Sequence, residues 1–220
     1  MSFFKVQTDE ENVKDGGNSN YISSTGMYDV TIEAMWVETN DKGARVIGLL
    51  ITYNDTLQPL FSAFRLDNND GSANFEQQAF NKFLITLGID ELEEPAVADL
   101  PIGKGKTDKE VLVFNEIEDM PATLKVVMEY GKYNGRIQER KKIKGTYRYS
   151  DKATAQEIVN NAETGKQYEK DAEKLGDIYK DGVTEEEIQE WIKNGRNSNA
   201  ISSAPSNTSD KPKRKFGKKE

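Results

Sequence analysis

The chain has 220 residues, enough for one sizeable domain with appendages or for two small domains. It contains no cysteine and no histidine, which excludes disulfides, thiolate nucleophiles, zinc sites with Cys or His ligands and His-based general bases. Apolar residues make up 35% and charged residues 31%, with a formal net charge of −8. We therefore expect the core in only part of the chain, and the charge disfavours indiscriminate binding to polyanions.

Residues 1–24 are polar and include a Gly/Asn/Ser run at residues 16–20, which predicts a flexible N-terminal arm. No apolar run is long enough to span a bilayer, and the first residues lack the charged-then-apolar order of a secretory signal. We therefore expect a cytoplasmic protein.

Three strands are predicted over residues 28–36, 44–53 and 57–66. In the first, apolar and polar residues alternate from Tyr28 to Trp36, which is typical of a half-buried strand. Turn sequences separate the three strands at regular spacing. This meander indicates a small antiparallel sheet or barrel.

A helix is predicted over residues 75–87, where apolar residues from Phe75 onwards recur at steps of three and four and Gly88 gives a stop signal. Residues 90–108 have the composition of a loop. The GKGKT sequence within that loop superficially resembles a phosphate loop, but the upstream glycine and the strand-to-helix context are missing. We interpret it as a flexible loop whose two lysines are candidates for DNA contact. A short strand is expected near residues 111–114.

Residues 123–149 have the most regular pattern in the chain, two strands joined at Asn134-Gly135. Both turn residues tolerate positive φ, so a two-residue type I′ hairpin turn is predicted. One face of the hairpin is apolar and carries Leu124, Val126, Met128, Tyr130, Ile137, Ile143 and Tyr147. The other, here called the basic face, carries Lys125, Tyr133, Arg136, Gln138, Arg140, Lys142, Lys144 and Arg148, with Glu129 as its only acid.

The basic face suits a nucleic-acid backbone. Its bases recur at steps of roughly 7 Å, two residues of strand rise, close to the phosphate spacing of an extended single strand. Tyr133, beside the turn, is the better tyrosine for stacking on a base, and Trp36 either stacks at a barrel rim or packs in the core. The alternative is a solvated face that keeps an edge strand soluble.

The predicted order of elements is three strands, a helix, a loop and a last strand pair. This order matches a five-stranded OB-like Greek-key barrel, whose helix lies between strands 3 and 4. We therefore predict a mainly β, antiparallel OB-like nucleic-acid-binding domain over residues 25–150. A β-sandwich with one helix is the competing architecture.

The character of the chain changes after residue 150. Residues 151–196 are predicted to form an acidic appendage of short helices, one from about residue 155 to 162 and one after Thr184, where the sequence matches a capping box. Residues 197–220 are predicted to be a disordered tail with a basic end at residues 211–219. That end is suited to nucleic acid, to an acidic partner or simply to solvent.

The order of these motifs resembles a known family. The motifs are a Gly-x-Tyr-x-Val-x-Ile opening from Gly26, an apolar helix stripe, a Tyr-Asn-Gly hairpin at Tyr133 and a Thr-Ala-x-Glu-Ile segment from Thr154. Over about residues 25–160, this order resembles that of the single-stranded-DNA-binding proteins of tailed bacteriophages. The resemblance implies an OB fold that coats single strands during phage DNA replication and recombination in the host cytoplasm, with no catalysis and no cofactor. Many such proteins recruit replication partners through an acidic C-terminal tail. Here the acids lie before a basic end, so the implied replication or recombination partners would bind through residues 151–220.

The sequence therefore predicts sequence-independent binding of single-stranded DNA by a protein that is not an enzyme. Phosphates would bind Lys125, Arg136, Arg140, Lys142, Lys144 and Arg148, and bases would stack on Tyr133 and Trp36. The alternative is a protein-interaction or scaffold module whose basic face docks an acidic protein. A hydrolase or nuclease is a third class, disfavoured because no pair of carboxylates has a spacing that specifies metal catalysis.

Overall fold

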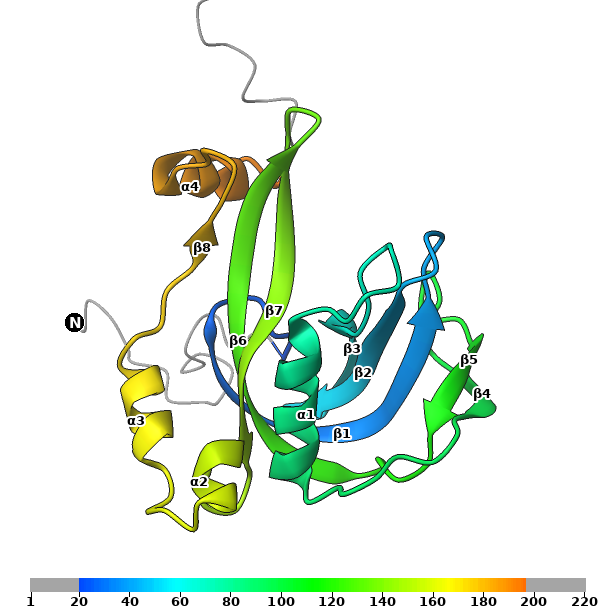
Figure 1. Ribbon diagram of the computed structural model, residues 1–220. Helices are drawn as coiled ribbons and strands as arrows, with labels where there is room; N and C mark the ends of the chain where they lie inside the picture. The colour runs from blue at the N-terminus through cyan, green and yellow to red at the C-terminus, as the bar shows by residue number, and fades with distance from the viewer. Residues whose placement is uncertain (1–19, 197–220) are drawn as a thin grey trace, which may run out of the picture. The chain divides into compact units, whose positions relative to one another are not determined.

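The computed structural model describes residues 20–196, so most of the predicted N-terminal arm and all of the predicted tail at residues 197–220 lie outside the described residues (Figure 1). The strands are β1 (Gly26–Thr39), β2 (Arg45–Tyr53), β3 (Thr56–Arg65), β4 (Ala96–Leu100), β5 (Lys109–Phe114), β6 (Met120–Tyr133), β7 (Arg136–Arg148) and β8 (Ile178–Tyr179). The helices are α1 (Glu76–Leu87), α2 (Ala155–Val159), α3 (Lys166–Ala172) and α4 (Glu185–Lys193).

The described residues form two compact units. The larger unit comprises residues 20–129 and 139–178, and the smaller unit comprises residues 130–138 and 179–196. The smaller unit therefore holds the tip of the β6–β7 hairpin, the end of β8 and α4.

The sheet is antiparallel, and β1 pairs with three other strands, β2, β5 and β6. Strands follow the order β3-β2-β1-β5-β4, and β6 pairs with β1, β7 and β8. The first half of β1, Gly26 to Ile32, pairs with β6, and Met35 to Val37 pairs with β5. The expected mainly β, antiparallel architecture with helices is confirmed. The eight strands of the described chain form a sheet that is not closed, so the five-stranded barrel is not confirmed.

A β-bulge in β1 divides the apolar residues of this strand between two clusters. The pairing register with β2 shifts between Ile32 and Ala34, and an extra residue in a strand inverts the side-chain alternation after it. Ile32 and Met35 consequently lie in the main core, whereas Trp36 lies in a second cluster that includes Leu50 and Ile102. The uniform alternation predicted from Tyr28 to Trp36 is therefore wrong beyond Ile32.

Helix α1 packs on the main core through Phe83, which is fully buried, and through the partly buried Phe80 and Leu84. It ends where predicted, at Leu87, because Gly88 adopts a left-handed conformation with φ of 76°. Phe75 was expected on the packed stripe, but it precedes the first turn and is 79% exposed. Phe75 therefore lies outside the packed face of α1.

The loop predicted over residues 90–108 is interrupted by β4, which pairs antiparallel with β5. Strand β4 has only five residues, and its alternation is weak because Ala96, Val97 and Asp99 are all exposed. Sequence patterning therefore had little signal to find it.

The hairpin turn is confirmed. Strand β6 ends at Tyr133, β7 begins at Arg136, and Asn134 and Gly135 have φ angles of 50° and 73°, as a type I′ turn requires. The predicted capping box at Thr184 is also present at the start of α4. Helix α2 has the same cap at Thr154 but ends at Val159, earlier than predicted.

Candidate nucleic-acid interface

Three of the six predicted phosphate-binding residues pair with carboxylates of the chain itself. The pairs are Lys125–Asp171 at 3.0 Å, Lys142–Glu76 at 3.4 Å and Arg148–Asp151 at 2.6 Å. The Lys125 side chain is only 12% exposed, and the Arg148 guanidinium makes two hydrogen bonds to Asp151, so both are held by the fold. Lys125 and Arg148 are therefore not suited to hold a phosphate in this arrangement.

The Arg148–Asp151 pair joins the last residue of β7 to the turn that follows, and the hydrogen bonds from Arg148 lower the pKa of the Asp151 carboxyl. The same interaction raises the pKa of the Arg148 guanidinium. Asp151 also accepts from the backbone N–H of Ala153, so the pair fixes the turn between β7 and α2. The pair therefore stabilises this turn, and we do not assign Arg148 to ligand binding.

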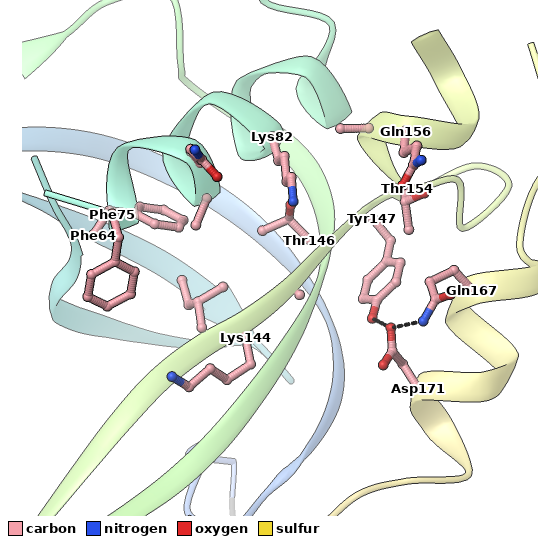
Figure 2. A pocket seen from close by; sticks show the side chains of 15 residues that line it. Phe64, Phe75, Lys82, Lys144, Thr146, Tyr147, Thr154, Gln156, Gln167 and Asp171 are labelled. Carbon is pink, nitrogen blue, oxygen red and sulfur yellow. Dashed lines mark hydrogen bonds between the residues drawn. The ribbon is translucent and has the colours of Figure 1, made fainter. Parts of the chain in front are cut away.

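Asp171 attaches α3 to the sheet through Tyr147 of β7 and Lys125 of β6, and it also bonds Gln167 within α3; Figure 2 shows the bonds to Tyr147 and Gln167. Its carboxylate accepts hydrogen bonds from Tyr147 Oη at 2.8 Å, Gln167 Nε2 at 3.1 Å and Lys125 Nζ at 3.0 Å. Burial raises the pKa of the Asp171 carboxyl, but these donors outweigh burial and the net pKa lies below the usual value. Burial, and next the bond to Asp171, raises the pKa of the Tyr147 hydroxyl.

Trp36 is 2% exposed and does not offer a face to a base. Its indole N–H donates to Glu38 at 2.8 Å, and its ring lies over Gly48 of β2. A Cβ at Gly48 would lie 2.1 Å from the Trp36 ring, so only glycine leaves room for it. Of the two alternatives for Trp36, packing is the one observed.

Phe61 is the aromatic residue that the fold exposes beside Trp36. The register between β2 and β3 shifts from Leu49↔Leu60 to Ile47↔Phe64, which leaves a bulge containing Ser62 with φ of 52°. Phe61 on this bulge is 56% exposed, and its ring meets Trp36 edge-on with centroids 5.9 Å apart. A buried indole thus supports an exposed phenyl ring.

A groove of about 610 Å³ lies between this bulge and β7. Residues 59–62 form one wall, and residues 139–142 form the other, with Arg140 exposed. The groove therefore combines the aromatic ring of Phe61 with two residues of the basic face, Arg140 and Lys142.

Phe61 also lines a second hollow, of about 370 Å³, on the side of the loop at residues 101–106. This loop contributes Lys104 and Lys106, both exposed, while Leu50 and Leu57 give the hollow an apolar floor. The structure thus places the two loop lysines that were candidates for DNA contact in a hollow that shares Phe61 with the groove.

Lys144 lines a third hollow, between α1, β7, α2 and α3 (Figure 2). Residues 139–142 line the groove and residues 143–147 line this pocket, so the two follow each other along the same strand. Within the larger unit, Arg140, Lys142 and Lys144 are therefore brought together along β7.

Tyr133 and Arg136 belong to the smaller unit and flank its hairpin turn. Tyr133 is 63% exposed and Arg136 is exposed. In this unit the backbone N–H of Lys180 donates to Tyr130, and Lys132 pairs with Glu187 of α4 at 2.9 Å. Both predicted residues remain accessible at the tip.

From the sequence, Phe61 was one of several aromatic residues with a face for stacking bases, and it was not chosen as a site residue, although one signal for its position was present. Gly48 interrupts an apolar strand, and an isolated strand glycine indicates a bulge or a close backbone approach. Phe75 and Lys82 were missed as well, although their seven-residue spacing places them on one face of α1.

Within residues 20–196, no three Asp or Glu side chains gather as a metal site would require. In the same part of the chain, no helix has both the length and the apolar character needed to cross a membrane. No protein-family model matches the chain, and the comparison with curated proteins found no match.

Proposed function

We propose that this protein binds single-stranded DNA without sequence specificity and without catalysis, in the replication or recombination of phage DNA. The observation that carries the proposal is the groove that the exposed Phe61 lines together with Arg140 and Lys142 of β7. The loose resemblance of the motif order to phage single-stranded-DNA-binding proteins supports the biological setting.

An aromatic ring beside a basic β-strand recognises two features that every nucleotide of single-stranded DNA has, a base and a phosphate. Every base has a π-face that stacks on an aromatic side chain, with a contribution of roughly 1–3 kcal/mol per base, and every nucleotide carries one phosphate. In a duplex the bases already stack on one another and their faces are closed. The groove therefore favours an unpaired strand over a duplex.

The phosphate contacts in this proposal differ from the predicted set. Arg140 and Lys144 are exposed on β7, and the ammonium of Lys142 can exchange its long 3.4 Å contact with Glu76 for a phosphate. Lys104 and Lys106 extend the positive surface beyond Phe61. We assign Lys125 and Arg148 to the fold instead.

The rival function is a protein-interaction module whose basic face docks an acidic protein. The observation in its favour is that carboxylates of this chain already pair with Lys125, Lys142 and Arg148. It predicts binding that shows no preference for nucleic acid.

The test is fluorescence anisotropy of a labelled oligo-dT at low and high salt, with a duplex of the same length as the comparison. Phe61→Ala is expected to weaken single-strand binding by about 1–3 kcal/mol. Arg140→Glu combined with Lys144→Glu should weaken it further and reduce its salt dependence. Lys174→Glu, an exposed lysine outside the three hollows, is the matched control for charge reversal.

Absence of binding to oligo-dT at low salt would contradict the proposal. Equal affinity for duplex and single strand would remove the role of Phe61 and leave only a general attraction between charges.

A further inference from the structure

The pocket between α1, β7, α2 and α3 has the size and chemistry of a small-ligand site (Figure 2). Its volume is about 370 Å³, within the range of roughly 300–1,000 Å³ typical of such sites. It is formed entirely within the larger unit, by residues on or beside five elements, the fifth being β3 through Phe64.

One face of α1 supplies an aromatic ring and a cation to this pocket. Phe75, Gln78 and Lys82 follow one another at spacings of three and four residues, so they share a helix face. Phe75 is 79% exposed, the most exposed large apolar side chain among the described residues. Most of the surface of this residue is therefore open to a ligand.

Lys144 on β7 supplies a second cation. Neither Lys82 nor Lys144 pairs with a carboxylate of residues 20–196, although both line the pocket. The acid in the pocket wall, Asp171, is already engaged by Lys125, Tyr147 and Gln167. The pocket therefore presents two uncompensated positive charges to a ligand.

Two further side chains can read the edge of a planar group. Gln78 on α1 and Gln156 on α2 are exposed, and each amide offers both a donor and an acceptor. An aromatic face, two primary amides and two ammonium groups match the three parts of a nucleotide, which are a π-face, a hydrogen-bonding edge and a phosphate.

We propose that this pocket holds one nucleotide of the bound strand, with its base on Phe75, its edge at Gln78 and Gln156, and its phosphate at Lys82 and Lys144. The inference rests on the proposed function, because the strand reaches the pocket from the groove along β7. Arg140 and Lys144 are four residues apart, about 13 Å of strand rise. At this one position the identity of the base affects affinity, whereas stacking on Phe61 tolerates any base.

The geometry can be tested with an oligo-dT in which 5-iododeoxyuridine replaces some of the thymidines. Near-ultraviolet light couples this base to aromatic side chains that it contacts, and peptide mass spectrometry locates the coupled residue. We expect coupled peptides that contain Phe75 as well as Phe61. Phe75→Ala should remove the first and keep the second.

Affinity gives an independent readout. Phe75→Ala should weaken oligo-dT binding about 5- to 100-fold, whereas Val97→Ala, which also removes an exposed apolar side chain, should leave it unchanged. Gln78→Ala combined with Gln156→Ala should change the ratio of the affinities for oligo-dT and oligo-dA by at least about threefold.

The possible failures are distinguishable. Tight binding with coupling at Phe61 alone, together with an unchanged affinity ratio, would overturn the nucleotide pocket and leave the groove intact. Absence of binding and of any coupled peptide would overturn both the pocket and the proposed function.

Discussion

Gly48 is the residue on which the position of Trp36 depends. An added Cβ would lie 2.1 Å from the indole ring, which is packed in the second cluster. Overpacking of a core generally costs about 1–3 kcal/mol, so Gly48→Ala should lower the free energy of unfolding by that amount. Urea denaturation followed by tryptophan fluorescence measures the change.

Gly176→Ala is the matched control for Gly48→Ala. Gly176 has no heavy atom within 4 Å of an added Cβ and its φ is not positive, so this substitution should be neutral or slightly stabilising. A similar loss of stability in the two variants would mean that backbone effects, and not the Trp36 contact, explain the result.

Asp171 should make stability depend on pH. Its carboxyl has a pKa below the unfolded value of about 3.9, so the native state favours its charged form. The resulting stabilisation is present at neutral pH and is lost as the pH falls through the folded pKa. Asp171→Asn should lower the free energy of unfolding by roughly 1–3 kcal/mol at pH 7, because the Lys125 ammonium then lacks its anionic partner.

The difference in unfolding free energy between wild type and Asp171→Asn should shrink from pH 6 to acid values, on the argument of linked protonation. Urea denaturation at a series of pH values tests this. A difference that stays constant down to about pH 2 would assign the effect to lost packing instead of to the charge, given the ordinary pKa of aspartate.

Among the elements, strand β3 owes its exposed ring to its bulge. Ser62 has φ of 52°, a conformation that costs an L-residue about 1–2 kcal/mol and that glycine adopts freely. Ser62→Gly should therefore keep the bulge, raise stability slightly and leave oligo-dT affinity unchanged. Ser62→Val should destabilise the bulge and weaken binding, because a β-branched residue disfavours this conformation.

Thermal unfolding and anisotropy titrations of the two Ser62 variants check this prediction. If Ser62→Val bound oligo-dT as tightly as wild type, the position of Phe61 would not depend on the bulge.

The predictability of these elements follows the range of the interactions that form them. The hairpin turn at Asn134-Gly135, the helix stop at Gly88 and the cap at Thr184 were predicted because each depends on a few neighbouring residues. The bulges in β1 and β3 were not, because an extra strand residue changes the alternation without changing composition. For that reason the sequence did not show that Trp36 is buried while Phe61 is exposed.

Long-range ion pairs limited the prediction of the site in the same way. Lys125 and Asp171 are 46 residues apart, and Lys142 and Glu76 are 66 apart, so no local pattern reveals that these lysines pair with carboxylates. The hairpin face was correctly read as rich in bases. Which of those bases remain for a ligand is decided only when the helices fold back onto it.

At the scale of the whole molecule, a net charge of −8 must coexist with attraction for a polyanion. The attraction is local, because charges separated by more than a Debye length, about 8 Å at physiological salt, are largely screened. The affinity for DNA should therefore depend on the few basic side chains that line the groove and the pocket, and hardly on the net charge of the protein.

The salt dependence of the affinity indicates how many of these basic side chains contact a phosphate. For a single strand, log K falls with log salt concentration by about 0.7 for each phosphate neutralised. Lys144→Gln removes a base that has no carboxylate partner among the described residues, so the slope should become less negative by about 0.7. Lys125→Gln should leave the slope unchanged, because Asp171 already neutralises this ammonium within the protein.

Titrations of oligo-dT across a salt series, with circular dichroism to confirm that each variant is folded, give both slopes. Equal changes in the two variants would mean that the Lys125–Asp171 pair opens when DNA binds, and that the strand crosses the full basic face instead of following β7 from the groove to the pocket.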